Sequence, residues 1–404
     1  MNSMNDSLNG SNSNENHLRI LLIARVFPPR IGGIERYIYN IYNRISKSFE
    51  ISVITPKETG DLIFDDSQTL NVIRTFRLPL IRDRLRTPLV GMIIHAFQEI
   101  YRNKPQQIHC DQFESAIISK LLSVYFRIPY IVYAYGMEIS DNKWIRLKSW
   151  ALRDAAAIIT ISEDTKNKLK ELPNISEERI KIVYPGVDTL RFKINRQDSR
   201  IRLMYGLCDK KIILTVGRLT HIREKGHDTV IKAMPGIVSC IPNSVYLVVG
   251  QGDDRNRLEQ LAHKHKIQEN IIFVGNVTDE NLHEYYQACD VFVMLSRDRV
   301  NKHGGILGEG FGIVFLEAGA CGKPVIGSKS GGIPDAIVNG ETGYLVDPTD
   351  LNAVVTAITN LLHDDNLAQR LGNCGRRRIE KYFTWYDTAK KVSKIVTSIY
   401  ESSL

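Results

Sequence analysis

Two glutamates stand eight residues apart in the segment GEGFGIVFLEAGACGKPVIGSKSGGIPD, residues 308–335. Between Glu309 and Glu317 lies a Gly-Phe-Gly turn that leads into an apolar stretch of helical character. Glycines allow close approach of a backbone to a ligand, and free N–H groups at a helix start attract phosphate. Carboxylates accept hydrogen bonds from sugar hydroxyls. The segment predicts a site for a phosphorylated, hydroxyl-rich ligand; the alternative is a loop and a buried helix with one exposed glutamate.

Two cations follow an apolar run in the second half of the chain. Arg218 comes directly after residues 211–217, and Lys225 follows seven residues later. At the end of a strand these side chains are well placed to neutralise a diphosphate, with arginine binding in a bidentate manner. A solvated pair of loop charges is the alternative. The glutamate segment shifts the balance toward diphosphate binding, because it predicts a phosphorylated ligand independently.

A diglycine follows the first apolar run. Pro28 and Pro29 end the predicted strand, and Gly32 and Gly33 open the next helix, where backbone amides can meet an anionic group. A nicotinamide-dependent dehydrogenase would carry G-x-G-x-x-G at this position, and the pattern is absent both here and after Gly250. The sequence therefore disfavours a dehydrogenase.

Short apolar runs alternate with helix-length segments in both halves of the chain, which predicts parallel sheets covered by helices on both faces. At 404 residues the chain exceeds the size of a single core. We predict a disordered tail at 1–17, Rossmann-like domains at 18–190 and 191–383 with a polar linker within 188–210, and a C-terminal helix at 384–404. A ligand would lie between the domains, beyond the carboxyl ends of the strands. The strands are predicted at 18–24, 51–55, 130–135, 157–162 and 180–184, and at 211–217, 245–250, 271–275, 291–296, 324–328 and 344–346.

The composition is ordinary for a soluble α/β protein, with 43% hydrophobic and 24% charged residues, and we predict a cytoplasmic location. The N-terminus lacks a secretory signal, no apolar run reaches the length of a membrane span, and the six scattered cysteines indicate reduced thiols. The net charge is +8, and five arginines at 74–86 alternate with apolar residues. This stretch predicts contact with an anionic membrane surface; a solvated loop is an equal alternative. Nucleic-acid binding is disfavoured, because no motif for it accompanies the charge.

Ordered motifs from residue 18 to residue 400 resemble the retaining glycosyltransferases of family 4, the group 1 glycosyl transferases. Within this family the chain is most similar to bacterial mannosyltransferases that modify phosphatidylinositol. The motifs that carry the resemblance are FPPRIGGIERY (27–37), YGMEI (135–139), TISEDTKNKL (160–169), YPGVD (184–188), VGRL…KG (216–226), VGQG (249–252), FVGNV (273–277) and EGFGIVFLEAGACGKPVIG…GGIPD (309–335).

The resemblance implies a GT-B fold of two facing Rossmann-like domains, with the C-terminal helix crossing back to the first. The second domain would bind a nucleotide-sugar donor, and the first would bind a lipid-linked or glycan acceptor. Arg218 and Lys225 would bind the donor diphosphate, Glu309 the hydroxyls of the transferred sugar, and Glu317 the ribose. The other implied contacts are backbone amides from Phe311, Gly312, Ile313 and Val314, the loop at Gly217, the loop ending at Val277 beside the base, and Gly33 from the opposing domain.

The chain departs from the family pattern at two places. Many relatives have a histidine where this chain has Tyr135, before Gly136, Met137 and Glu138. Tyr135 and Glu138 are expected on the acceptor or sugar side of the site. Tyr135 can donate a hydrogen bond but cannot shuttle protons near neutral pH, so we do not expect it to act as a general base. Residues 297–308 form a charged, glycine-containing insertion. It is interpreted as a surface loop, with a mobile flap over the donor as the alternative.

The predicted function is hexose transfer from GDP-mannose or a UDP-hexose in cell-envelope or polysaccharide synthesis, at the inner membrane face and with retained anomeric configuration. No metal or other cofactor is expected, because no D-x-D motif lies beside the site. Arg218, Lys225 and Glu309 would form the catalytic group. A non-catalytic sugar-nucleotide-binding component of a polysaccharide-assembly complex is the alternative, and a sugar-nucleotide epimerase is disfavoured by the paired glutamates.

Overall fold

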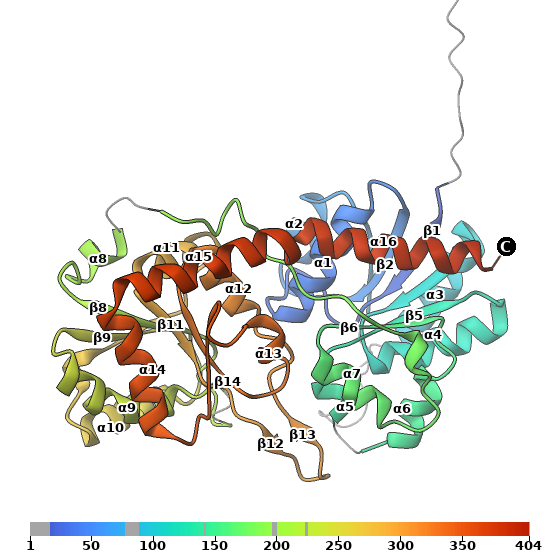
Figure 1. Ribbon diagram of the computed structural model, residues 1–404. Helices are drawn as coiled ribbons and strands as arrows, with labels where there is room; N and C mark the ends of the chain where they lie inside the picture. The colour runs from blue at the N-terminus through green and yellow to red at the C-terminus, as the bar shows by residue number, and fades with distance from the viewer. Residues whose placement is uncertain (1–16, 77–88, 141–142, 196–199, 223–224, 404) are drawn as a thin grey trace, which may run out of the picture.

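The computed structural model describes residues 17–76, 89–140, 143–195, 200–222 and 225–403. Two α/β domains lie side by side, and the last two helices run across both of them (Figure 1). The predicted fold class is therefore confirmed, including the C-terminal helix that crosses back to the first domain. The tail predicted for residues 1–17 lies, up to residue 16, outside the described residues.

The N-terminal domain is built on a parallel sheet with the strand order β3-β2-β1-β4-β5-β6-β7. Its central strands are almost entirely buried and rich in apolar residues, as expected for a sheet covered on both faces. The strands are β1 (Arg19–Ile23), β2 (Glu50–Pro56), β3 (Asn71–Thr75), β4 (Gln107–Cys110), β5 (Tyr130–Ala134), β6 (Ala157–Thr160) and β7 (Ile180–Ile182). The helices are α1 (Gly33–Ile45), α2 (Asp61–Asp66), α3 (Leu89–Asn103), α4 (Phe113–Phe126), α5 (Met137–Ser140), α6 (Ile145–Leu152), α7 (Glu163–Lys170) and the 3-10 turn η1 (Glu177–Arg179).

The C-terminal domain repeats this architecture with the strand order β10-β9-β8-β11-β14-β15. A separate antiparallel pair, β12 and β13, projects from it. The strands are β8 (Lys211–Val216), β9 (Ser244–Val249), β10 (Ile271–Gly275), β11 (Val291–Met294), β12 (Arg299–Val300), β13 (Ile306–Leu307), β14 (Val325–Ser328) and β15 (Gly343–Val346). The helices are α8 (Arg200–Met204), α9 (His227–Cys240), α10 (Arg255–Lys264), α11 (Leu282–Ala288), α12 (Ile313–Ala320), α13 (Ile333–Ala336) and α14 (Leu351–His363), with 3-10 turns η2 (Gln268–Asn270) and η3 (Asp279–Asn281).

Helices α15 (Asp365–Tyr382) and α16 (Trp385–Glu401) lead the chain back to the N-terminal domain (Figure 1). Thr384 starts α16 as its N-cap, because its side chain accepts a hydrogen bond from the Asp387 amide. Along α16, the Val396 carbonyl accepts a 2.8 Å hydrogen bond from Gln107 of β4. The Trp385 ring packs on Tyr37 of α1, with 6.3 Å between ring centroids. The last helix is thus part of the N-terminal domain.

An aromatic contact joins the two domains close to the glutamate segment. Tyr184 follows β7, Phe311 precedes α12, and Phe383 lies between α15 and α16. The ring centroids of the three pairs lie 5.5–6.0 Å apart. All three residues pack in one hydrophobic cluster that also contains the inner faces of β1 and β5. Because such contacts fix the two domains against each other, the loops on the facing sheet edges have defined positions.

Arg74, the first residue of the predicted membrane stretch at 74–86, is not a surface cation, and contact of the stretch with a membrane stays a prediction. Arg74 lies in β3 with only 7% of its side chain exposed, and its guanidinium makes two hydrogen bonds of 2.7–2.9 Å to Asp65. A buried arginine held by a carboxylate cannot bind lipid headgroups. Residues 77–88 lie outside the described residues. Among the helices that are described, none is long and apolar enough to cross a bilayer.

Candidate functional site

Glu309 and Lys225 form an ion pair at the carboxyl ends of the second sheet. The Lys225 Nζ atom lies 2.5 Å from Oε2 of Glu309, and Ser296, after β11, donates a 3.2 Å hydrogen bond to the same oxygen. The two charged side chains are 18% and 15% exposed. Lys225 and Ser296 come from loops after β8 and β11, which are parallel neighbours and so end at the same edge of the sheet, and Glu309 follows β13 of the hairpin. The structure thus brings together one predicted diphosphate cation and the predicted sugar carboxylate.

Glu317 occupies a separate position in the second turn of α12, eight residues after Glu309. Its side chain is 2% exposed, and it accepts hydrogen bonds from Arg36 Nη1 at 2.6 Å and from Tyr286 at 2.7 Å. Arg36 also makes two 2.8 Å hydrogen bonds to Asp279 of η3. Burial raises the pKa of Glu317 above its usual range, although Arg36 and the Tyr286 hydroxyl act against this. Arg36 comes from α1, so this carboxylate connects the two domains.

Two glycines in the predicted motifs have backbone conformations that side chains disfavour. Gly312 has φ 87° and forms the N-cap of α12. Gly226 has φ 73°, and a Cβ atom at this position would overlap the Leu295 carbonyl oxygen. Both lie in the left-handed region, which glycine adopts readily. Gly226 holds the loop with Lys225 against the end of β11, which keeps the Lys225 side chain directed toward Glu309.

The remaining predicted donor residues surround this edge without forming one continuous cluster. Gly217 packs against the Lys225 side chain, and Arg218 follows it with an exposed side chain. Gly33 is the first residue of α1, with open space around the position of a Cβ. The Val277 side chain packs on the core after β10. Phe311 is buried in the aromatic contact, so only its backbone can meet a ligand; Ile313 and Val314 form the first turn of α12.

Tyr135 and Glu138 lie at the end of β5 and the start of α5. Glu138 Oε1 accepts a 2.6 Å hydrogen bond from the Tyr135 amide, and burial raises the pKa of Glu138 above its usual range. The Tyr135 ring packs edge-on against Tyr37, and within the described residues its buried hydroxyl has no hydrogen-bond partner. A Cβ at Gly310 would lie 2.8 Å from the Tyr135 carbonyl oxygen. The backbone of Tyr135 therefore borders the glutamate loop, whereas its hydroxyl points into the core.

Sequence reasoning missed several residues of this region. Arg36 and Tyr286 bind Glu317. Arg36 lies within the motif FPPRIGGIERY but was not singled out from it, and Tyr286 lies in none of the quoted motifs. His227 directly follows the Lys225-Gly226 pair. Burial lowers the pKa of its imidazole to about 4, and its Nε2 atom has no partner within the described part of the chain. The burial of this imidazole beside Gly217 is a result of the fold. The one signal for His227 in the sequence is its place directly after the motif that ends at Gly226.

Family models match both domains of the chain. The model described as Glycosyltransferase Family 4 matches residues 31–191, and the model described as Glycosyl transferases group 1 matches residues 206–378, which carry Lys225, Glu309 and Glu317. The chain belongs to the group 1 glycosyl transferases of family 4. This assignment confirms the resemblance inferred from the ordered motifs.

Individual relatives agree with this assignment. The glycosyltransferase is 28% identical to the GDP-mannose-dependent alpha-(1-6)-phosphatidylinositol monomannoside mannosyltransferase of Mycolicibacterium smegmatis, over 95% of this chain and 99% of that protein. Solved structures of similar fold include Anabaena HepE in complex with UDP, at TM-score 0.80 and 18% identity over 94% of this chain and 100% of that one. Another is sucrose-phosphate synthase from Thermosynechococcus elongatus, at TM-score 0.80 and 24% identity over 96% and 100%. At these identities the solved structures establish the GT-B fold alone.

No group of three or more histidine, cysteine, aspartate or glutamate side chains is arranged to hold a metal ion within the described ranges. The acidic residues of this glycosyltransferase's site instead have cationic partners, Lys225 for Glu309 and Arg36 for Glu317. Metal-independence stays a prediction.

Proposed function

We propose that the chain transfers a hexose from a nucleotide-diphosphate sugar to a lipid-linked or glycan acceptor, with retention of the anomeric configuration and without a metal ion. The observation that carries this proposal is the Lys225–Glu309 ion pair, which combines a phosphate-binding cation with a hydroxyl-binding carboxylate on one sheet edge. A nucleotide sugar presents a partner for each of these side chains close together, because its diphosphate is joined to the hydroxyl-bearing sugar ring through a single oxygen atom.

The leaving group is the main electrostatic problem in this reaction. When the bond to the sugar breaks, negative charge develops on the diphosphate, and positive charge develops on the anomeric carbon. Arg218, Lys225 and the amides of the first turn of α12 would stabilise the departing diphosphate. Glu309 would hold sugar hydroxyls once Lys225 shifts toward the phosphate. Retention would follow from attack on the same face, with the departing phosphate helping to deprotonate the acceptor hydroxyl.

The nucleoside would lie toward Glu317. Its carboxylate accepts two hydrogen bonds already, and each oxygen has a second lone pair for a ribose hydroxyl. Val277 and the turn after β10 would flank the base. Arg36 bridges Glu317 and Asp279, so it would border the nucleoside from the N-terminal domain.

The names of the relatives support two donor candidates. GDP-mannose is the named donor of the mycobacterial mannosyltransferase, and the HepE complex contains UDP. A thermal-shift screen of GDP-mannose, UDP-glucose, UDP-galactose and ADP-glucose would separate them, since a ligand that binds the native state raises the apparent stability. We expect a GDP-sugar or UDP-sugar to raise Tm, and excess EDTA to leave the shift unchanged. A chain that responds to none of the four sugars would contradict the proposal.

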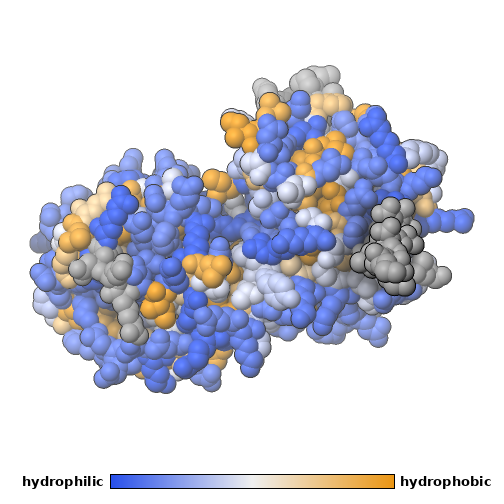
Figure 2. All heavy atoms as spheres, turned by 90° about the horizontal axis from the view of Figure 1, so that it is seen from above, coloured by the Kyte–Doolittle hydropathy of each residue, from blue (hydrophilic) through white to orange (hydrophobic). Residues whose placement is uncertain are grey.

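A lipid-linked acceptor is supported by the same relative, whose named acceptor contains phosphatidylinositol. The N-terminal domain also exposes large apolar side chains on α3 and α4, and Figure 2 shows apolar patches on the surface of the molecule. They include Val90, Ile94, Tyr101, Leu121, Val124 and Tyr125. Flotation with phosphatidylglycerol and with phosphatidylcholine vesicles tests membrane association. Equal recovery from both kinds of vesicle would argue against an anionic membrane surface.

A further inference from the structure

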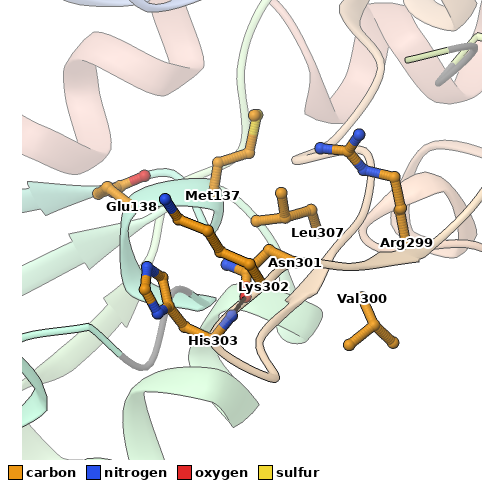
Figure 3. A pocket seen from close by; sticks show the side chains of 8 residues that line it. All are labelled: Met137, Glu138, Arg299, Val300, Asn301, Lys302, His303 and Leu307. Atoms are coloured by element: carbon orange, nitrogen blue, oxygen red, sulfur yellow. Dashed lines mark hydrogen bonds between the residues drawn. The ribbon is translucent and has the colours of Figure 1, made fainter.

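A pocket of about 600 Å³ opens between α5 of the N-terminal domain and the β12–β13 hairpin of the C-terminal domain. Figure 3 shows Lys302 and His303 reaching from the hairpin tip toward the α5 side, with Arg299 on the opposite flank. The remaining wall is formed by Met137, Glu138, Val300, Asn301 and Leu307. This pocket is distinct from the sites proposed for the diphosphate and the nucleoside.

Residues 297–308, predicted as a surface loop, are largely exposed and contain the β12–β13 hairpin. The Asn301 side chain accepts 2.9 Å hydrogen bonds from the His303 and Gly305 amides, which fixes the turn. At the base, Arg297 forms an ion pair with Asp228, and Ser330 donates a 2.6 Å hydrogen bond to Asp298. The turn and the base of this hairpin are therefore held in place across from α5.

The charge of the pocket is predominantly positive. Arg299 and Lys302 carry one positive charge each, His303 can add a third, and Glu138 is the single acidic side chain among the lining residues that the structure describes. One oxygen of Glu138 is already engaged by the Tyr135 amide. The side chains of Arg299, Lys302 and His303 form no ion pair or hydrogen bond with any residue that the structure describes, and all three are exposed. Unpaired cations gathered in a concave site favour an anionic ligand.

The pocket lies beside the place where sugar transfer would occur. Strand β13 ends at Leu307, two residues before Glu309, and α5 begins directly after Gly136 and Tyr135, whose carbonyl borders Gly310. A molecule in the pocket would thus lie next to the sugar held by Glu309, on the side facing the N-terminal domain. This position would suit an acceptor rather than the donor nucleotide, which would extend toward Glu317.

We infer that this pocket binds a phosphate group carried by the acceptor, with Arg299 and Lys302 as the residues that select for it. The inference rests on the proposed transferase function and names its acceptor class: a hydroxyl compound with a phosphate monoester or diester close to the hydroxyl that receives the sugar. The apolar side chains of Met137, Val300 and Leu307 would contact the carbon skeleton between these two groups.

Binding of sn-glycerol 3-phosphate, with glycerol as the neutral control, tests the inference by calorimetry. Excess UDP and GDP are present throughout, so the donor diphosphate site is occupied. The double variant Arg299→Gln/Lys302→Gln is compared with Lys264→Gln/Arg370→Gln, which removes two exposed cations from α10 and α15. Circular dichroism verifies that both variants are folded. We expect the pocket variant to bind about tenfold or more weakly, because two charge-assisted hydrogen bonds are lost, and the control to bind like the unmodified chain.

A second arm identifies the source of the phosphate. Sedimentation with phosphatidylglycerol and phosphatidylcholine vesicles is measured for the same variants. If binding of glycerol 3-phosphate requires Arg299 and Lys302, the acceptor is a soluble phosphate compound. If only binding to phosphatidylglycerol vesicles requires them, the acceptor is a lipid. Equal binding by the pocket variant and the control in both arms, or no preference for phosphate, overturns the inference. If no nucleotide sugar raises Tm in the thermal-shift screen, the proposed function is contradicted. The phosphate titration does not depend on that screen, so the two failures can be told apart.

Discussion

Arg36 of α1 donates a 2.6 Å hydrogen bond to Glu317 of α12, across the boundary between the two domains. The same guanidinium makes two hydrogen bonds to Asp279, and Tyr286 donates to the other oxygen of Glu317. Burial acts to lower the pKa of Arg36, but Glu317 and Asp279 outweigh this and raise it above its ordinary value. The carboxylate proposed to bind the ribose is therefore also a contact that holds the domains together.

Replacing Arg36 by methionine is expected to destabilise the chain by about 3 kcal/mol, because it leaves the Glu317 carboxylate buried without its cation. Urea unfolding followed by circular dichroism measures this loss. Arg200→Met is the matched control: Arg200 is 78% exposed and lies 3.7 Å from Glu284, so its loss should cost less than about 1 kcal/mol. Equal effects of the two substitutions would show that the Arg36–Glu317 contact contributes no more than a surface ion pair.

Gly226→Ala tests the backbone that positions Lys225. Alanine at this position has to adopt φ 73° and meets the Leu295 carbonyl oxygen, so we expect a loss of roughly 2–4 kcal/mol in unfolding free energy. Gly206→Ala is the control, because Gly206 has φ 65° but open space around its Cβ position. It should cost only the backbone strain, about 1–2 kcal/mol. Identical losses in urea unfolding would mean that the contact with Leu295 is not tight.

The buried imidazole of His227 predicts a defined pH dependence. Its pKa is about 4 in the folded chain, against an ordinary value of 6.5, so the folded state holds the neutral form. As pH falls below 6.5, the unfolded state gains a proton that the folded state does not take up until pH 4. The difference in unfolding free energy between the unmodified chain and His227→Asn should therefore be constant above pH 6.5. At pH 4.5 it should have changed by about 2–3 kcal/mol to the disadvantage of the unmodified chain.

Unfolding titrations of both chains at several pH values between 7.5 and 4.5 measure this difference. Comparing the two chains cancels the contributions of the other titrating groups, such as Asp111, whose pKa is raised to about 6 by burial. A stability difference that stays constant over this range would contradict the burial of a neutral imidazole.

The sequence predicts the strands well wherever they are uniformly apolar. Strands β8 and β10 lie where apolar runs at 211–217 and 271–275 predict them. Strand β4 was missed because Gln107 and His109 interrupt its pattern, although both are fully buried. Their hydrogen bonds to Val396 and Tyr42 explain how they are accommodated, and these partners stand far away in sequence. A hydrophobic pattern cannot show that a buried polar side chain will form a hydrogen bond with a residue far away in the sequence.

The candidate site shows the same division. Glu309, Lys225 and Gly312 are visible as motif residues, because their chemistry and spacing are local. Arg36 becomes part of the site only when α1 faces α12, and the hairpin pocket exists only because β12 and β13 face α5. Likewise, Arg74 looks like a surface cation in the sequence, and only the fold reveals Asp65 beside it. Contacts between the domains depend on the tertiary arrangement, which local patterns do not specify.

Donor-dependent release of nucleoside diphosphate by Glu309→Gln and Arg218→Ala tests the central claim most directly. The rate is measured from GDP-mannose and UDP-glucose with a membrane lipid extract as acceptor, and Glu259→Gln, which removes an exposed carboxylate of α10, serves as the control. We predict that each site variant keeps its circular dichroism spectrum and loses about 10²–10³-fold in kcat, because groups aimed at developing charge are removed. The control should keep the full rate. Full activity in both site variants would contradict the assignment of Glu309 and Arg218 to sugar transfer.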